Sequence, residues 1–305
     1  MMRFSGKFSR RLYISEIFIY LKDFNINRHT FSYCLQAKSF AVTLKRNINN
    51  HEKPYAMKVL IIYAHPNPMS FTKAILDNFV RGLTESGHQY EVIDLYKIKF
   101  NPVFQDMDSA FFVDEDMPQE LFQQMDMRGM IVGLAGGPVR RLIARLYIKN
   151  KTDADLIKLI QSQKPKDVLL QQKKVAEADV LVFITQVFWM HFPALVKGWM
   201  ERVLTYGFAY KLNENGWKGD PDGRIPLLKI KKAVIMQPTF FNEIVYREKG
   251  FKAAMEKTID DWSFKYPGIK DVDHIYFHSI LSVSPETRKK YLGIAYLKGK
   301  ELKCS

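Results

Sequence analysis

MKVLIIYAHPNPMSFT, residues 57–72, is the stretch that decides the fold. It contains an uninterrupted apolar run, residues 59–64. Such a run is typical of a central strand in a parallel sheet, because both faces of that strand are buried. A polar loop follows, and residues 71–86 then show the apolar spacing of a helix that Gly87 ends. The stretch therefore predicts a strand, a polar loop and a helix in succession.

The same alternation continues along the chain. Further strands are expected at residues 90–95, 180–184, 233–236 and 274–280, and helices at 168–178, 193–204 and 251–264. The segment from 100 to 170 is more irregular, with a Met-rich acidic stretch near 105–127 and helical pieces near 138–148 and 152–162. Strands that alternate with helices predict an α/β fold, a doubly wound parallel sheet with helices on both faces.

The composition fits one large folded domain with an appendage. The chain has 305 residues, of which 47% are apolar. It has no run of about 18 or more uncharged apolar residues, so no transmembrane segment is expected; the nearest stretch, residues 129–148, contains three arginines. The two cysteines, Cys34 and Cys304, lie near the ends without a CxxC motif or a histidine cluster. This argues against a disulfide scaffold and a metal site, and favours the reducing cytoplasm.

The net charge of +14 is unevenly distributed. Residues 1–56 carry ten Lys and Arg against three Asp and Glu, and residues 57–305 carry 36 against 29, so each part has a net charge of +7. A strongly basic chain is one mark of a nucleic-acid binder, but no nucleic-acid-binding motif accompanies the charge here. A mildly basic domain instead suits an anionic cofactor, and no nucleic-acid partner is expected.

Residues 1–56 have no clear period, and three interpretations stay open for them. The first is a targeting presequence, although the acidic residues Glu16 and Asp23 are unfavourable in such a peptide. The second is an additional segment that packs or docks. The third is an extension of the gene model upstream of a true start at Met57. The last is favoured because Met57 leads directly into the first strand. The expected domains are thus a basic extension, 1–56, and one α/β domain, 57–305.

Parallel sheets bind ligands beyond the carboxyl ends of their strands, so the residues after each strand are the candidates. The loop after the first strand contains His65 and feeds a helix through Ser70 and Thr72. Free backbone N–H groups at a helix N-terminus bind anions, although Ser70 would also serve as a plain N-cap. The loop lacks the glycines of a Walker A or a GxGxxG motif.

Aromatic side chains follow the strands that are expected at residues 180–184 and 233–236. Residues 185–193, TQVFWMHFP, suggest an apolar flat partner such as an isoalloxazine ring, or a dimer contact; the alternative is that Trp189 belongs to the core. Residues 237–243, QPTFFNE, come after the next strand, and Tyr246 lies a little further on. A tyrosine in such a loop can donate a proton to a substrate oxygen, although a lone tyrosine is more often structural.

Together these segments resemble the NAD(P)H:quinone oxidoreductase family, which has a flavodoxin-like fold. The resemblance covers about residues 57–282 and is strongest over residues 189–210, WMHFPALVKGWMERVLTYGFAY. There the family pattern is an aromatic flavin loop, then P-A-(I/L)-(L/V)-K-G-W-(F/M)-E-R-V, then G-(F/W)-A-Y. The opening KVLIIYAHPNPMSFTKAI is similar to the start of the family's domain.

The resemblance implies a role for particular positions. The residues that would hold the flavin diphosphate are His65, Ser70, Phe71 and Thr72. Those that would lie under the isoalloxazine ring are Gln186, Val187, Phe188, Trp189 and Met190, and Thr239 belongs to a third flavin loop. Glu201 would lie near the adenosine end. Tyr246 matches the tyrosine that stabilises charge as the flavin accepts hydride. Lys252 aligns with that tyrosine's histidine partner and would supply positive charge in its place.

The sequence also departs from the family. The family's Thr-Thr-Gly-Gly flavin loop is here Pro238-Thr239-Phe240-Phe241, so two glycines have become phenylalanines. These rings stack over the flavin and narrow the pocket, or they belong to the core; both interpretations stay open. Either the chain is a divergent member with reshaped substrate access, or flavin binding is weakened.

The implied activity is two-electron transfer by a ping-pong route, from NADH or NADPH through bound flavin to a quinone or another flat acceptor. FAD is favoured over FMN by the resemblance alone. The family also implies a homodimer with the site at the twofold interface. Three other functions compete: an electron-carrying flavodoxin, a regulatory flavoprotein subunit docked on a membrane transporter, and a flavin-free scaffold. Peripheral membrane contact is considered through the leader and the Arg140–Arg145 helix.

Overall fold

The computed structural model describes residues 56–304, apart from the side chain of Gln119. The chain divides into two units, Met1–Tyr55 and Ala56–Ser305, and only the second is described below. The three interpretations of the N-terminal extension therefore fall almost entirely outside the described residues. The proposed boundary between an extension and an α/β domain stays a prediction.

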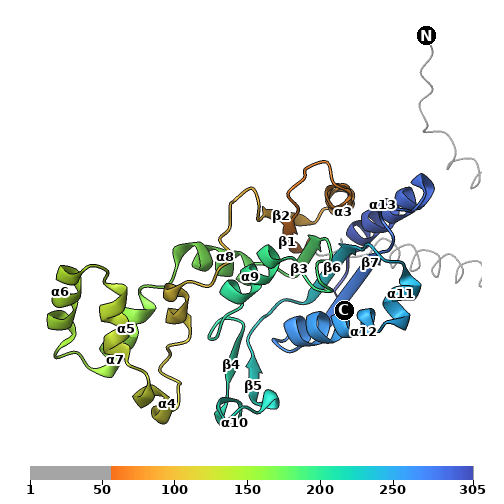
Figure 1. Cartoon of the computed structure of the whole chain (residues 1–305). Coiled ribbons are helices and arrows are strands. Elements are labelled where there is room, and N and C mark those ends of the chain that lie inside the picture. Colours follow the sequence, from red (N-terminus) through yellow and green to blue (C-terminus); the bar gives the residue numbers. More distant parts are fainter. Residues whose placement is uncertain (1–55, 305) are drawn as a thin grey trace, which may run out of the picture. The chain divides into compact units, whose positions relative to one another are not determined.

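The second unit is built on a five-stranded parallel sheet (Figure 1). Its strands lie in the order β2 (Gln89–Asp94), β1 (Lys58–Ala64), β3 (Val180–Thr185), β6 (Lys232–Pro238) and β7 (Asp271–Phe277). In register, Val59 of β1 pairs with Tyr90 of β2 on one side and with Val180 of β3 on the other. A separate antiparallel ribbon consists of β4 (Tyr210–Leu212) and β5 (Arg224–Pro226).

The helices connect these strands. The α-helices are α3 (Phe71–Glu85), α4 (Gln119–Gln124), α5 (Met127–Leu134), α6 (Pro138–Ile148), α7 (Asp153–Gln161), α8 (Lys166–Ala176), α9 (Ala194–Val203), α10 (Glu214–Trp217), α11 (Glu243–Glu248), α12 (Phe251–Met255) and α13 (Pro285–Lys300). The other helices are the 3₁₀ helices η1 (Asp106–Phe111) and η2 (Pro221–Gly223) and the π-helix η3 (Glu256–Lys265).

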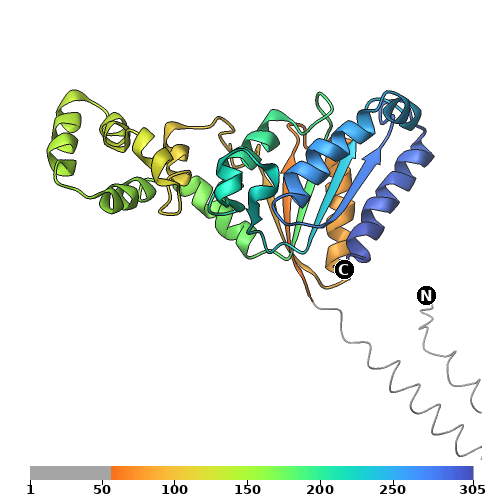
Figure 2. The same ribbon diagram turned by 90° about the horizontal axis from the view of Figure 1, so that it is seen from below.

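Each face of the sheet is covered by its own set of helices. Helices α3 and α13 pack on one face, over Ile61 and Val182 (Figure 2). Helices α8, α9 and α12 and the π-helix pack on the other face, over Leu60 and Phe183. Because β1 and β3 are buried on both faces, their side chains are apolar without alternation. The predicted doubly wound parallel sheet is confirmed.

The C-terminal third differs in detail from the expectation. The last strand begins at Asp271, three residues earlier than expected, and the helix expected at 251–264 continues as a π-helix from Glu256. Helix α13 follows and was not anticipated. Its start carries an ordinary signal, since Ser284 caps it by accepting from Thr287 N–H and Pro285 is its first residue.

Two glycines allow α3 and α13 to pack closely. A Cβ on Gly82 would lie 2.2 Å from the Tyr296 carbonyl oxygen, and one on Gly299 would lie 2.2 Å from the carbonyl oxygen of Phe79. Both contacts are with backbone, which cannot move aside as a flexible side chain would. The missing side chains are therefore what lets the two helix backbones approach.

This contact gives a matched pair of predictions within α13. Gly299→Ala should lower the free energy of unfolding by roughly 1–3 kcal/mol, because the added methyl group must push the helices apart. Gly293→Ala meets nothing within 4 Å and should raise it by about 0.5–1 kcal/mol. Urea unfolding followed by circular dichroism compares the two. A stabilising Gly299→Ala would show that the helices are not in close contact.

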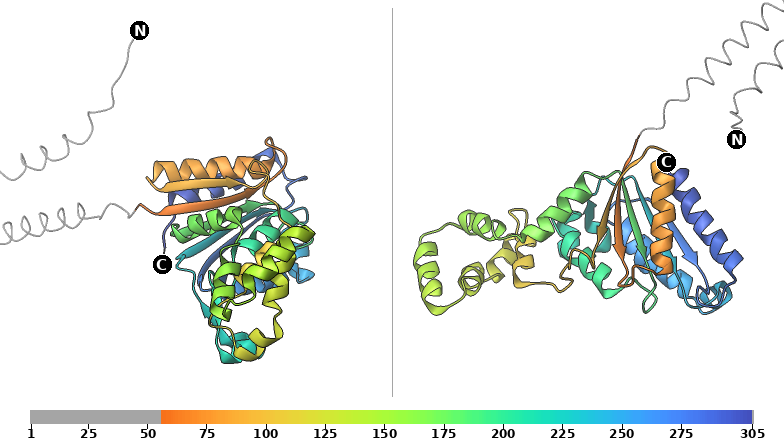
Figure 3. Two further views of the ribbon diagram at one scale, coloured as in Figure 1. Left: turned by 90° about the vertical axis from the view of Figure 1, so that its left-hand side faces the viewer. Right: turned by 90° about the horizontal axis from the view of Figure 1, so that it is seen from above.

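Between β2 and β3 the chain forms a separate cluster of helices. The segment from 100 to 170 is more regular than expected: besides the anticipated α6 and α7 it contains η1, α4 and α5. Leu156, Ile157 and Ile160 of α7 pack with Met127 and Ile148 in a core separate from those on the sheet. Figure 3 shows α5–α7 beside the sheet rather than on either of its faces. This cluster is therefore an insertion into the α/β fold.

Candidate active site

The loops after β1, β3 and β6 surround a cavity of about 450 Å³ at the carboxyl edge of the sheet. The lining residues are His65, Ser70, Phe71, Thr72, Gln186, Val187, Phe188, Pro238, Thr239, Phe240, Ile280, Leu281 and Arg288. Eight residues expected from the sequence thus lie around one cavity. Arg288, a cation from α13, was not expected from the sequence, because that helix was not predicted.

The N-terminus of α3 forms one side of this cavity. Ser70 caps the helix, its hydroxyl accepting from Lys73 N–H at 3.1 Å. The first N–H groups of a helix have no partner within it, and with the positive end of the helix dipole they favour an anion. Burial lowers the pKa of His65, so this imidazole is neutral at neutral pH and leaves the helix end as the main source of positive potential on this side.

A tight turn after β3 presents an aromatic ring to solvent. The Trp189 side chain is 99% exposed, so the interpretation of Trp189 as core is wrong. Phe188 and His191 exchange two backbone hydrogen bonds, of 3.0 and 2.9 Å, around Trp189 and Met190. The φ angles of those two residues are 49° and 55°, which a two-residue turn of this kind usually assigns to Asn and Gly. Bulky residues kept in strained conformations commonly mark functional sites.

Gln186 has a side-chain oxygen that lacks a hydrogen-bond partner in the described part of the chain. It lines the cavity, and its side-chain oxygen Oε1 is buried without a hydrogen-bond partner among the described residues. Leaving a buried acceptor unpaired costs about 1–3 kcal/mol, so such groups are usually completed by a ligand or water. A donor such as the imide N–H of a flavin ring would pair with this oxygen.

The loop after β6 contains Phe240 and Phe241, for which two places were considered, the ligand pocket and the core. Phe240 is 66% exposed and lines the cavity, and Phe241 is also exposed, so neither belongs to the core. Their rings meet edge to face, with centroids 5.1 Å apart. Thr239 beneath them is buried, and its hydroxyl donates to the Phe241 carbonyl oxygen at 2.9 Å. Phe240 therefore narrows the cavity from one side, and Phe241 packs against it without lining the cavity.

Tyr246 is buried on α11 and does not line the cavity. Its side chain interacts with that of Thr239, which does, and burial raises the pKa of the Tyr246 phenol. Lys252 lies half-exposed and pairs with Glu256 at 3.7 Å, while Glu201 on α9 pairs with Lys197 at 3.4 Å. These three positions are thus not brought into the cavity, and neither are Trp189 and Met190.

His278 is a second residue that the sequence analysis missed. Its ring lies edge to face against Tyr246, with centroids 5.1 Å apart, and its Nδ1 lies 3.1 Å from the Thr239 hydroxyl. Burial lowers the pKa of this imidazole, so it is neutral at neutral pH. The strand expected at 274–280 placed His278 inside it, whereas β7 ends at Phe277, so the rule that selects residues after each strand did not find His278.

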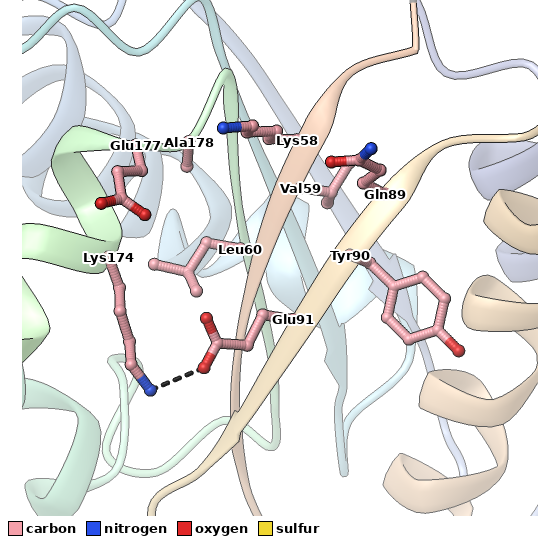
Figure 4. Close-up of a pocket in the computed structure, with 9 residues that line it drawn as sticks. All are labelled: Lys58, Val59, Leu60, Gln89, Tyr90, Glu91, Lys174, Glu177 and Ala178. Carbon is pink, nitrogen blue, oxygen red and sulfur yellow. Dashed lines mark hydrogen bonds and ion pairs between the residues drawn. The ribbon is translucent and has the colours of Figure 1, made fainter.

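A smaller cavity, of about 200 Å³, lies at the opposite edge of the sheet, at the amino ends of β1 and β2 (Figure 4). Glu91 and Lys174 form an ion pair of 2.6 Å across it. Ligands of parallel sheets bind at the other edge, and Glu91 and Lys174 already pair with each other here. We therefore place the functional site at the carboxyl edge.

A doubly wound parallel sheet in the order β2-β1-β3-β6-β7, with a cavity at its carboxyl edge, is typical of the flavodoxin-like class of α/β proteins. The chain belongs to the flavodoxin-like fold family, whose model matches residues 57–295.

Similar proteins agree with this assignment. The chain is 31% identical over 219 residues to a ribosyldihydronicotinamide dehydrogenase-like protein of Penicillium crustosum, with 70% of each chain covered. It is 27% identical to an NAD(P)H oxidoreductase of Haemophilus influenzae, covering 78% of this chain and 92% of that one. The solved structure of an NAD(P)H:quinone oxidoreductase from Methanothermobacter marburgensis superposes with a TM-score of 0.57 at 25% identity, covering 81% and 100%. The resemblance to the NAD(P)H:quinone oxidoreductase family is thereby confirmed.

Two further observations concern only residues 56–304. None of their helices is long and apolar enough to cross a membrane. Their His, Cys, Asp and Glu side chains form no group of three that could hold a metal ion.

Proposed function

We propose that the protein is a flavin-dependent NAD(P)H:quinone-type oxidoreductase. The observation that carries the proposal is the cavity at the carboxyl edge, where the N-terminus of α3 and the unpaired Gln186 oxygen offer complementary groups to one ligand. A flavin has the matching parts, a phosphate and a ring with an imide N–H. The relatives named above, which are oxidoreductases by name, support the same activity.

The residues fit a flavin in the following way. Ser70, Phe71 and Thr72 would hold its phosphate at the start of α3, and Gln186, Val187 and Phe188 would hold its ring, with Trp189 and Met190 on the adjoining turn. The bound flavin would supply hydride transfer between NAD(P)H and the acceptor. Phe240 and the exposed Trp189 would position flat substrates and exclude water. Of the two flavins, we propose FAD, on the resemblance of the loops, with Glu201 toward its adenosine end.

Tyr246 is the proposed stabiliser of charge on the ring. Because its side chain is buried, we expect it to act through Thr239, which lines the cavity and interacts with both Tyr246 and His278. Lys252 would contribute only long-range positive charge from its half-exposed position. Tyr246→Phe should therefore lower the rate of hydride transfer while leaving flavin affinity nearly unchanged.

We further propose that the protein acts as a homodimer in the cytoplasm. A fully exposed Trp189 beside the exposed Phe188 is unusual on a monomer surface, and a second copy would cover both rings. The dimer test is the mass of the purified chain by light scattering, compared with that of Trp189→Ala. A monomeric wild type would contradict this assembly.

The activity is tested on the purified full chain through its visible absorbance spectrum. Bound yellow flavin that bleaches with NADH or NADPH and recovers with a quinone is the expected result. Chromatography of the released cofactor distinguishes FAD from FMN. Turnover separates an enzyme from an electron carrier, a regulatory subunit and a scaffold. A protein that stays colourless after addition of either flavin would overturn the proposal.

A further inference from the structure

Helix α6 turns its apolar face away from the protein. Five large apolar residues on it are each between 57% and 70% exposed: Val139, Leu142, Ile143, Leu146 and Tyr147. Their spacing places them on one stripe along the helix. On the opposite side, Ile148 is buried in the core of the helical cluster and Ala144 is partly buried. Figure 1 shows α6 at the outer side of this cluster, away from the sheet.

The same helix is strongly basic. Residues 138–151 contain three arginines and two lysines and no acidic residue. Arg140, Arg141 and Arg145 are exposed, and Arg140 and Arg145 flank the apolar stripe on its two sides. The end of the helix is held to its neighbour, because Arg128 of α5 donates to the carbonyl oxygens of Ile148 and of Lys151. The apolar stripe and its flanking cations are therefore presented together on an anchored helix.

From these observations we infer that α6 docks the protein on the surface of an anionic membrane. A helix that lies in a membrane interface presents apolar side chains to the acyl boundary and cations to the anionic headgroups, and α6 offers both. The inference does not depend on the proposed oxidoreductase activity, because α6 contributes no residue to the cavity at the carboxyl edge.

Charge disfavours the other occupants of this face. A second copy that paired its own α6 here would bring two sets of five cations together. Residues 1–55 carry the same sign, with ten basic against three acidic residues. A nucleic acid would neutralise the arginines but would leave the apolar stripe in water. An anionic lipid surface would both neutralise the arginines and cover the apolar stripe.

The experiment measures sedimentation of the full chain with vesicles of phosphatidylcholine alone and of phosphatidylcholine mixed with phosphatidylserine. We expect binding to the anionic vesicles to be about tenfold stronger or more, and to weaken as salt is raised. Leu142→Ser with Leu146→Ser should reduce that binding about tenfold, and so should Arg140→Gln with Arg141→Gln and Arg145→Gln.

A matched control is Leu169→Ser with Leu170→Ser, two exposed leucines of α8. This variant should bind the vesicles like the wild type, and circular dichroism verifies that every variant is folded. If the α6 variants bind anionic vesicles as well as the wild type, α6 is not the docking element and the inference is wrong. It is also wrong if substitution of the two α6 leucines converts an oligomer into a smaller species, or if the arginines bind RNA without any need for the leucines.

Discussion

Replacing Asp108 by alanine should lower the free energy of unfolding by about 3 kcal/mol or more. Asp108 is fully buried in η1 and pairs with Arg202 of α9, whose side chain is 3% exposed. Two hydrogen bonds join them, of 2.7 Å from Nε and 3.1 Å from an Nη atom. Alanine would leave the guanidinium buried with much of its charge uncompensated. Urea unfolding of the full chain measures the loss.

The remaining partners of Arg202 provide the controls. Asp167 accepts from the same guanidinium at 2.9 Å but is 53% exposed, so Asp167→Ala should cost no more than about 1 kcal/mol. Combining Asp108→Ala with Arg202→Met removes both buried charges. The double variant should therefore lose about 2 kcal/mol less free energy of unfolding than the two single variants lose together. Additive losses would show that the two charges do not depend on each other.

The pair matters because of what it connects. Arg202 also donates to the Asn101 carbonyl oxygen at 2.9 Å, so α9 holds the start of the segment that leads from β2 into the helical cluster. The motif that contains Arg202 was recognised in the sequence as a family feature without a role for this residue. Its buried partner lies 94 positions earlier in the chain, a pairing that no local pattern discloses.

Ser70→Asp should weaken flavin binding about 100-fold while leaving the fold intact. Aspartate is as good an N-cap as serine, and a negative charge is favourable at a helix N-terminus, so α3 keeps its start. The same carboxylate would lie beside the flavin phosphate. Two like charges about 4 Å apart repel by about 4 kcal/mol near a protein surface, and about 1.4 kcal/mol corresponds to a tenfold change in affinity. Screening by salt reduces that repulsion, and the remainder corresponds to a loss of flavin affinity of roughly 100-fold.

The matched control is Ser70→Asn, which has the shape of aspartate and caps helices equally well but carries no charge. Titration of the flavin-free protein, followed by quenching of flavin fluorescence, gives both affinities. The difference between Asp and Asn should narrow at high salt, because the repulsion is screened. Equal affinities of the two variants would mean that the phosphate does not lie at the start of α3.

The sequence located most of the cavity because that part of the site follows from local chemistry. In a parallel sheet every strand ends at the same edge, so His65, Gln186 and Thr239 could be grouped from the strand boundaries alone. Eight of the residues expected for the flavin and its surroundings line the observed cavity. Arg288 could not be found, since it lies on a helix whose weak apolar pattern gave no prediction.

What the sequence by itself determined is the class of fold and the edge that carries the site, because burial on both faces of a strand leaves an apolar run that needs no knowledge of its neighbours. Only the tertiary structure decided which apolar side chains stay in water. Trp189 is fully exposed on a strained turn, and the regular stripe of α6 faces outward although its spacing resembles that of a buried helix. Periodicity fixes which side chains share a face, but whether another element covers that face depends on contacts between residues far apart in the chain.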